Sequence, residues 1–510
     1  MTLNYAEILT GGAVGRPDAP TALGFLELAK AGREVWNQWR TDFPTKKNQE
    51  TGGWSNHVFW RDDPNAQLVS LRDHGVSDFA GFHFGDGADF YGQLFPIGML
   101  AIFKGATFGH DTNFRNAQFG GGVTFEGAVF GNDAFLNNLN FDSNSPPSAP
   151  QEQWIVFDGA RFGDRARLQD WQLSWRHGIE SMPTISFQKE CAFGASLFFS
   201  TAYNCVTARC ISFSGTSFGA EAVFNGGNQD GLTQDFAFES CVVGPRASFQ
   251  GLVLKKAKFD RSQFGDGVNF SGIGYRNTFG EISFSNVKFE GVADFSNRQF
   301  GARTLFSKAK FSQVPLFHNS ELHQDTAFDE SSFPARAKGD GQSSRAYRTL
   351  KLAMSKSQAT NTEQFFFRKE MAEEQKELWR EGDHLRWLLY AAYGNLSEFG
   401  GSVLRPTIWF FATLLLSAGL YAQSSGVKPF WVSGLPLDID QTLGWMTFSA
   451  VNSLPLGGLD DAARELRNTL HLTGALRNPF FTVLVVLHKL SSILFLFLIG
   501  LALRNHFKMK

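Results

Sequence analysis

The chain has 510 residues, a formal net charge of −2 and 43 % hydrophobic residues. It is too long for one ordinary domain, and its near-zero charge argues against a general nucleic-acid binder, which would carry a strong basic excess. Phenylalanine is unusually abundant, with 54 Phe against 8 Tyr, so we expect one type of ring to fill one repeated site.

The residues that usually carry chemistry form no recognisable constellation. The four cysteines lack the spacing of a zinc site, and no phosphate-binding glycine loop, Ser/His/Asp set or catalytic carboxylate pair stands out. We therefore expect no enzyme, no metal and no cofactor. Cys191 and Cys241 are expected to be small buried side chains. The N-terminus lacks a basic start followed by an apolar run, so no secretory signal is predicted and most of the chain is expected in the cytoplasm.

The N-terminal segment 1–78 is expected to be a helical cap and lead-in. Within it, Thr21 to Pro44 ("TALGFLELAKAGREVWNQWRTDFP") places apolar residues, including Trp36 and Trp39, at helical spacing. A repeat stack exposes its terminal coils and needs such a cover, so this helix is predicted to cap the first coil.

In residues 79–333, phenylalanines recur at an interval that fits neither a helix nor a strand. From 103 to 135 the rings recur at intervals of five or six residues, whereas a helix repeats near 3.6 and a strand near 2. This phenylalanine repeat is irregular from 141 to 186 and then continues to Phe333. A small or β-branched residue often stands two positions before the ring: Ala106, Ala117, Val123, Ala128, Val268, Val287, Ala293 and Ala309.

A chain that turns every five or six residues, with one inward ring per side, describes a four-sided coil of roughly 22 residues per turn, stacked at about one strand spacing. Glycine often follows the ring, as at Gly109, Gly120 and Gly163, and we expect it to supply a positive φ at the corner. Ser143 to Pro147 is predicted to lie in a loop that leaves one coil.

Units such as Ala106-Thr107-Phe108-Gly109 and Ala128-Val129-Phe130-Gly131 resemble those of pentapeptide-repeat proteins. The resemblance covers about half of the chain. It implies a mainly β fold, a right-handed quadrilateral β-helix or solenoid over 79–333. Because no catalytic constellation stands out and the charge is near zero, we expect this solenoid to be a scaffold or sensor with a possible protein partner and no nucleic acid.

After the repeats the composition changes at 334, and residues 334–400 are predicted to be a helical linker. The membrane domain is predicted over 401–510, with transmembrane helices at 406–424 and 479–503. Arg405 precedes the first span, and Arg504, His506, Lys508 and Lys510 follow the second. By the positive-inside tendency both termini and the solenoid face the cytoplasm, at a bacterial inner (cytoplasmic) membrane.

The segment 442–460 between the spans is apolar, too short to cross a bilayer and followed by glycines, which is typical of a re-entrant loop. It resembles the pore loop of two-span channels of the potassium-channel type, although Asn452, Leu454 and Pro455 replace the threonines of that family. Potassium selectivity is therefore not carried over. The pore-loop candidates are Phe448, Ser449, Asn452, Pro455, Gly457, Gly458 and Asp460. A helix at the outer interface is predicted to follow from Asp461.

Ionisable residues within the second span mark either function or a local partner. His488, Lys489, Ser491 and Ser492 are candidates for lining or gating a pore; alternatively, Lys489 snorkels and His488 packs against a neighbour. The sequence thus predicts a protein embedded in the lipid bilayer, an oligomeric channel-like pore, most simply a tetramer of identical chains, with a cytoplasmic β-helical sensor or scaffold. The alternative is a membrane-anchored protein-binding scaffold without conduction.

Overall fold

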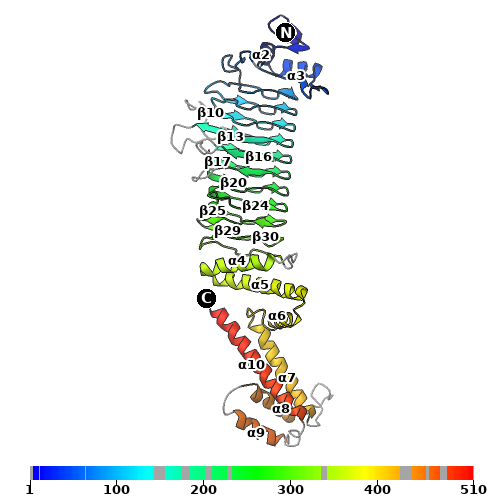
Figure 1. The fold of residues 1–510 in the computed structure, drawn as a ribbon, viewed down its shortest axis with the longest axis vertical. Helices are drawn as coiled ribbons and strands as arrows, with labels where there is room; N and C mark the ends of the chain where they lie inside the picture. Colours follow the sequence, from blue (N-terminus) through cyan, green and yellow to red (C-terminus); the bar gives the residue numbers. More distant parts are fainter. Residues whose placement is uncertain are drawn as a thin grey trace. The chain divides into compact units, whose positions relative to one another are not determined.

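A computed structural model of the protein describes residues 4–10, 12–63, 65–142, 155–174, 184–201, 208–226, 233–334, 342–424, 439–454, 459–470 and 479–508. The chain divides into two compact units, Met1–Lys338 and Gly339–Lys510. The first unit holds the repeats, and the second is helical (Figure 1).

Short helices and hairpins begin the first unit: α1 (Tyr5–Ile8), β1 (Gly15–Arg16), β2 (Ala19–Pro20), α2 (Ala22–Ala31), α3 (Arg33–Asp42), β3 (Lys46–Lys47) and β4 (Trp54–Ser55). Trp36 and Trp39 on α3 are fully buried. The Trp36 indole N–H donates to the carbonyl of His83 at 2.8 Å, and the Trp36 ring centroid lies 5.4 Å from that of Phe84. Helix α3 therefore packs over the first coil of the repeats.

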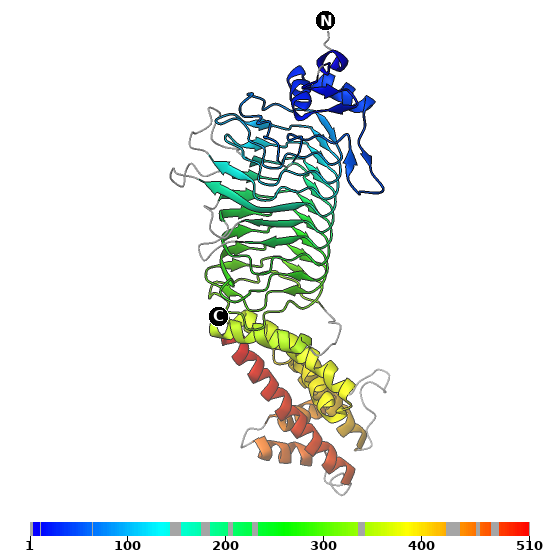
Figure 2. The same ribbon diagram turned by 45° about the horizontal axis from the view of Figure 1, so that its top comes forward.

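The repeats form stacked parallel strands (Figure 2). One ten-stranded sheet contains β5 (His83–Gly85), β7 (Thr107–Phe108), β9 (Val129–Phe130), β12 (Arg161–Phe162), β15 (Ala192–Phe193), β18 (Ser217–Phe218), β21 (Val242–Val243), β23 (Gln263–Phe264), β26 (Lys288–Phe289) and β30 (Lys310–Phe311). A second contains β6 (Ala101–Ile102), β8 (Val123–Thr124), β11 (Ile155–Val156), β14 (Thr184–Ser186), β17 (Ala208–Ser212), β20 (Thr233–Ala237), β22 (Leu254–Lys258), β25 (Thr278–Ser283), β28 (Gln299–Phe300) and β29 (Thr304–Leu305).

The remaining strands of the repeats are β10 (Asn140–Asp142), β13 (Arg167–Ser174), β16 (Phe198–Thr201), β19 (Val223–Asn225), β24 (Val268–Asn269) and β27 (Ala293–Asp294). In the turn that starts at Val123, four successive sides are formed by β8, β9, Phe135 and β10. Each side pairs in parallel with the corresponding side of the preceding turn. Phe108 pairs with Phe130, 22 residues further on. The prediction of a β-solenoid is confirmed.

The phenylalanine rings form the core of the solenoid because most of them stack on the ring one turn away. The Phe108 and Phe130 centroids are 4.6 Å apart with an interplanar angle of 9°, and those of Phe130 and Phe162 are 4.5 Å apart with an angle of 1°. The small residues predicted to face inward, such as Ala106 and Ala128, are fully buried. A single coil exposes its rings, so only the stack supplies the burial that stabilises each turn.

The glycines that follow the rings have a different role from the predicted one. Gly109, Gly131 and Gly163 do not have a positive φ; a Cβ on any of them would meet the coil before it, at 2.6 Å from backbone in the case of Gly131. We call these stacked positions the glycine ladder: Gly109, Gly131, Gly163, Gly194, Gly219, Gly244 and Gly265. The prediction that they supply positive φ is wrong, because close approach between coils is what requires glycine there.

Positive φ occurs instead two residues after the glycine ladder, at Asp111 (57°) and Asp133 (59°), and two residues after many of the rings on other sides. The latter corners carry Asn116 (60°), Gly127 (65°) and Asn138 (52°). Asparagine and aspartate tolerate this left-handed conformation better than other side chains do. The corners therefore explain the Gly, Asn and Asp between the rings.

The coils keep their register across the irregular part of the phenylalanine repeat. Phe130 pairs with Phe162, and Phe162 pairs with Phe193, at separations of 32 and 31 residues. The loop predicted at Ser143 to Pro147 lies within 143–154, outside the described residues. The extra residues of these turns are thus accommodated between ladder positions that remain stacked.

The second unit is helical: α4 (Gln342–Lys356), α5 (Thr360–Glu381), α6 (His384–Ser397), α7 (Leu404–Ser424), α8 (Ile439–Ser453), α9 (Leu459–Thr469) and α10 (Pro479–Lys508). The buried carboxylate of Glu370 on α5 joins α4 through Arg348 Nε at 2.7 Å and Lys351 Nζ at 2.8 Å. Helices α7 and α10 lie side by side (Figure 1). Both are long and apolar enough to cross a membrane, at Leu404–Gln423 and Phe480–Phe507.

Candidate functional site: a buried polar cluster between the apolar helices

Helix α8 packs against α7 and α10 through an apolar core. The core consists of buried residues from α7, α8, α9 and α10: Ala418, Tyr421, Ala422, Trp445, Phe448, Ala463 and Phe481. Trp445, Phe448 and Asn452 recur at intervals of three and four residues, and Ser453 stands four residues after Ser449, so these buried residues lie on one side of α8. The buried face of α8 therefore packs against other helices of the same chain.

A histidine on α10 lies at the centre of this packing. His488 is 3 % exposed. Its Nδ1 is 2.8 Å from the hydroxyl of Tyr421 on α7, and its Nε2 is 3.0 Å from the hydroxyl of Ser453 on α8. The Ser453 hydroxyl also donates to the carbonyl of Ser449 at 2.8 Å. Three helices thus meet at one imidazole.

These contacts are consistent with a single direction of donation. Because Ser453 donates to a carbonyl, its oxygen accepts from an Nε2–H of His488. The remaining nitrogen, Nδ1, then accepts from the Tyr421 hydroxyl. A neutral imidazole has one donor and one acceptor, so this arrangement satisfies both of its nitrogens.

Two further polar side chains of α8 are hydrogen-bonded, one to α7 and one within α8 itself. The Ser449 hydroxyl donates to the carbonyl of Leu414 on α7 at 2.8 Å, and the Asn452 amide donates to the carbonyl of Phe448 at 2.9 Å. The buried Ser492 hydroxyl on α10 has no hydrogen-bond partner among the described residues. We call Tyr421, Ser449, Asn452, Ser453, His488 and Ser492 the polar cluster.

The structure brings together five of the predicted site residues, namely Phe448, Ser449, Asn452, His488 and Ser492, all of them buried. Ser491 and Lys489 are half-buried, and the Ser491 hydroxyl donates to the His488 carbonyl of its own helix. Pro455, Gly457 and Gly458 lie outside the described residues, and Asp460 belongs to α9 with an undescribed side chain.

Sequence reasoning missed Tyr421 and Ser453 as partners of His488. Tyr421 reads as an interfacial aromatic at the end of an apolar span, and its contact with His488 joins residues 67 positions apart. Ser453 offered a signal, because it lies four residues after Ser449 and therefore on the same helix face.

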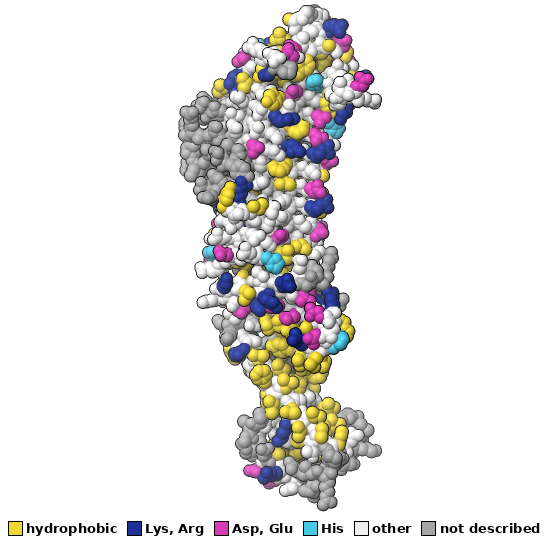
Figure 3. All heavy atoms as spheres, viewed as in Figure 1, with side chains coloured by type: hydrophobic (Ala, Val, Ile, Leu, Met, Phe, Trp, Pro, Cys, Tyr) yellow, Lys and Arg dark blue, Asp and Glu magenta, His cyan; other side chains and the backbone are white. Residues whose placement is uncertain are grey.

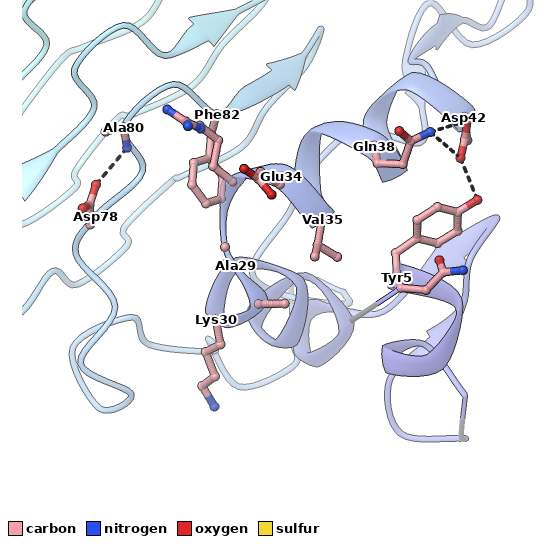
Figure 4. A pocket seen from close by; sticks show the side chains of 14 residues that line it. Tyr5, Ala29, Lys30, Glu34, Val35, Gln38, Asp42, Asp78, Ala80 and Phe82 are labelled. Atoms are coloured by element: carbon pink, nitrogen blue, oxygen red, sulfur yellow. Dashed lines mark hydrogen bonds between the residues drawn. The ribbon is translucent and has the colours of Figure 1, made fainter. Parts of the chain in front are cut away.

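A separate groove lies in the first unit, between α1, α3 and the first coil (Figure 4). It is an open groove of about 1280 Å³ with a polar lining. Tyr5 donates its hydroxyl to Asp42 at 2.7 Å, and this hydrogen bond raises the pKa of Tyr5. Gln38 also donates to Asp42, at 3.2 Å. Tyr5, Gln38 and Asp42 thus satisfy one another, and the lining also includes Lys30, Arg33 and Glu34, so the groove carries charges of both signs.

The comparisons with known proteins concern the repeats. Residues 99–145 match the model of the family described as pentapeptide repeats (9 copies). Searches of the curated proteins and of the solved structures give no significant match. The matched segment runs from the strand pair β6–β8 to β10, within the stacked coils described above. The chain is therefore a pentapeptide-repeat protein with a β-solenoid region.

Proposed function

We propose that this protein is a membrane-anchored, non-enzymatic scaffold whose solenoid binds a protein partner. The observation that carries the anchor is the outward surface of α7 and α10. In the most apolar window of each helix, only 28 % and 22 % of the residues are buried. A core helix of a soluble protein would be mostly buried, whereas a spanning helix presents apolar side chains to lipid.

The outward residues are large and apolar, as lipid contact requires. On α7 they include Ile408, Trp409, Phe411, Leu415 and Leu416, and on α10 Val483, Val486, Leu487, Leu490, Ile493, Leu494 and Phe497. The α7 end at Arg405 and the α10 end at Arg504 carry the flanking cations. The positive-inside tendency then favours a cytoplasmic solenoid and cytoplasmic termini at a bacterial inner membrane.

The solenoid supports the scaffold part of the proposal by its construction. Most of its rings are buried, so its outer surface is made largely by the residues between them, which include exposed apolar side chains such as Val242 and Tyr275. Stacked repeats present extended surfaces of this kind to protein partners. The right-handed, quadrilateral winding implied by the family resemblance belongs to this proposal.

A second candidate is an ion-conducting pore made by several identical chains, most simply four. The polar cluster favours it, because polar groups at membrane depth usually mark function and Ser492 lacks a partner among the described residues. Within one chain, however, His488 and Asn452 face their own helices. A shared pore would need residues that face away from the subunit, so we prefer the anchor.

Topology tests the anchor. In a chain whose native cysteines are replaced by alanine, Asn468→Cys on α9 and Arg303→Cys in the solenoid place single thiols at exposed positions. We expect a membrane-impermeant maleimide to label Asn468→Cys on intact cells and Arg303→Cys only after permeabilisation. Labelling of both before permeabilisation, or of neither, contradicts the proposed orientation.

Ion flux separates the two candidates. Purified protein in liposomes is compared for potassium, sodium and chloride flux, with Gly457→Val as the pore variant. Gly500→Val is the matched control, because Gly500 lies on an exposed part of α10 with nothing near its added side chain. Flux that is abolished by the first change and kept by the second establishes the pore. We expect no flux, which leaves the anchor.

A further inference from the structure

Helix α6, just before α7, has a large exposed apolar face. Leu385, Leu388 and Leu389 are 72 %, 57 % and 63 % exposed, and Ala392 is also exposed. Their spacing of three and four residues places them on one face of the helix. We call these four residues the α6 face. A contiguous exposed apolar face of this kind indicates an interaction surface.

The two ends of α6 are fixed, one by a cap and the other by contacts with its own unit. Asp383 caps the helix by accepting from the Arg386 amide at 3.1 Å. At the other end, Ser397 is fully buried, and the Asn505 amide of α10 donates to the Gly400 carbonyl at 3.1 Å. Helix α6 is therefore fixed beside the ends of α7 and α10, where the proposed spans leave the membrane on the cytoplasmic side.

The surface around α6 changes from charged to apolar. Figure 3 shows Lys, Arg, Asp and Glu side chains gathered over α4 and α5, and hydrophobic side chains over α6 and the adjoining parts of α7 and α10. Leu404, at the start of α7, is also 68 % exposed. Trp379 is 55 % exposed, with its ring 4.8 Å from that of Trp387. Tryptophans are enriched where a membrane meets water.

The charges beside the α6 face fit an anionic surface. The Arg386 side chain is 72 % exposed and that of Arg405 is 50 % exposed. Each is paired with a carboxylate, Arg386 with Asp383 at 3.3 Å and Arg405 with Glu398 at 3.9 Å, and a headgroup phosphate would share or replace these contacts. A groove of about 370 Å³ between α5 and α6 adds Arg368 and Lys369, and Glu398 is the single carboxylate that lines it. Phospholipid headgroups present phosphates, for which arginine and lysine are the preferred partners.

We propose that α6 is an interfacial helix that lies on the cytoplasmic leaflet of an anionic bilayer. Leu385, Leu388 and Leu389 insert at the boundary between headgroups and acyl chains, while Arg386 and Arg405 bind headgroup phosphates. The inference rests on the proposed anchoring by α7 and α10. It assigns α6 a role beyond that of a linker, because a helix held on the lipid surface fixes how the chain leaves the membrane.

The test uses the full chain in vesicles of phosphatidylcholine and phosphatidylglycerol, with native cysteines replaced by alanine. An environment-sensitive fluorophore is attached at Leu388→Cys, at Leu352→Cys or at Leu487→Cys. Leu352 on α4 is the matched control, an equally exposed leucine (54 %) away from the α6 face, and Leu487 on α10 reports the span itself. Spin-labelled lipids quench fluorophores in the bilayer, and iodide quenches those in water.

We expect lipid quenching at 388 and 487 and iodide quenching at 352. Iodide quenching at 388 together with lipid quenching at 487 overturns the interfacial helix but keeps the anchor. Protection of 388 from both quenchers shows a second copy or another protein on the α6 face, which also overturns it. Loss of lipid quenching at 487 overturns the anchor itself.

The charge component has its own measurement. Lipid quenching at 388 should weaken when phosphatidylglycerol is omitted, and Arg386→Gln should reduce this dependence. Glutamine keeps most of the length of the side chain and removes its charge. Equal quenching with and without the anionic lipid contradicts the proposed phosphate contacts.

Discussion

Gly131 lies directly against the peptide unit that follows Gly109, one coil earlier. A Cβ on Gly131 would stand 2.6 Å from the Gly109 carbonyl carbon and 2.7 Å from its oxygen. The Gly131 amide donates to the Phe108 carbonyl at 3.0 Å, so the two coils are held at this separation. The same contact recurs between Gly219 and Gly194, at 2.6 Å. The glycine ladder therefore lets adjacent coils approach at one corner.

Gly131→Ala should destabilise the solenoid because the added methyl group meets backbone, which cannot move without separating the coils. Overpacking of this kind costs about 1–3 kcal/mol. The measurement is thermal unfolding of the full chain in detergent, followed by circular dichroism of the β signal. An unchanged midpoint would show that the coils shift at no cost and that close approach does not explain the ladder.

Gly127→Asn is the matched control for that change. Gly127 has φ +65° with nothing within 4 Å of an added Cβ, and Asn116 and Asn138 occupy the equivalent corner on other sides of the coils. Asparagine tolerates this conformation, so the unfolding midpoint should stay close to that of the unchanged protein. The two glycines lie four residues apart and differ in what they require.

Arg298 is a buried cation inside the solenoid, at a position where other sides carry Ala or Val two residues before the ring. It is 1 % exposed, and its Nη1 and Nη2 donate to the carbonyls of Leu252 and Phe249 at 2.8 and 3.0 Å. Its guanidinium carbon lies 4.0 Å from the Phe279 ring centroid. Burial lowers the pKa of Arg298 to about 9. Its Nε also donates to the carbonyl of Phe270, so the guanidinium satisfies carbonyls from two adjacent coils.

Arg298→Ala should destabilise the solenoid although it restores the small residue of the repeat. Each buried carbonyl that is left without a hydrogen-bond donor costs on the order of 1–3 kcal/mol. Arg303→Ala, at a neighbouring exposed arginine, should have little effect on the same thermal unfolding measurement. If the two variants unfold at similar temperatures, the carbonyls beside Arg298 are satisfied by water or by rearrangement.

The sequence predicted the solenoid because the phenylalanine interval reports a local rule, one ring per side of each coil. The Phe108–Phe130 stack follows directly from that interval. The reason for Gly131 could not be read in the same way, since a glycine that supplies positive φ and one that makes room for a neighbouring coil look identical in sequence. Both apolar helices were predicted from composition, whereas the contact of Tyr421 with His488 depends on how the helices pack.

Acid should destabilise the solenoid through its carboxylate pairs. Arg165 donates to Asp133 at 2.8 and 2.6 Å and lowers the pKa of Asp133, and hydrogen bonding by Lys104 lowers the pKa of Glu126. A carboxylate with a lowered folded-state pKa adds stability that is present above its unfolded pKa, near 4, and is lost as pH falls through the folded value.

We therefore expect a flat unfolding midpoint from pH 8 to about pH 5 and a decline below about pH 4. Arg165→Gln should make this decline shallower, because Asp133 then titrates near its usual value in both states. The effect should be small, since the pair is largely exposed. A steeper decline in Arg165→Gln would contradict this explanation.

Tyr421→Phe and Ser453→Ala test whether His488 is a structural junction. Each change removes one hydrogen-bond partner of the imidazole, and such bonds within membranes are worth about 0.6–1.7 kcal/mol. Because Tyr421 and Ser453 satisfy the two nitrogens of one neutral ring, losing the first frees the ring to reorient. The double variant should then cost less than the sum of the single changes.

The measurement is unfolding of the full chain in mixed micelles, followed by its helical signal. Ser491→Ala is the matched control, because the Ser491 hydroxyl donates to the His488 carbonyl of its own helix, and it should be nearly neutral. If Tyr421→Phe and Ser453→Ala leave stability unchanged but alter ion flux in liposomes, His488 belongs to a conduction pathway. Loss of stability without flux instead identifies His488 as the contact that holds α8 between the two apolar helices.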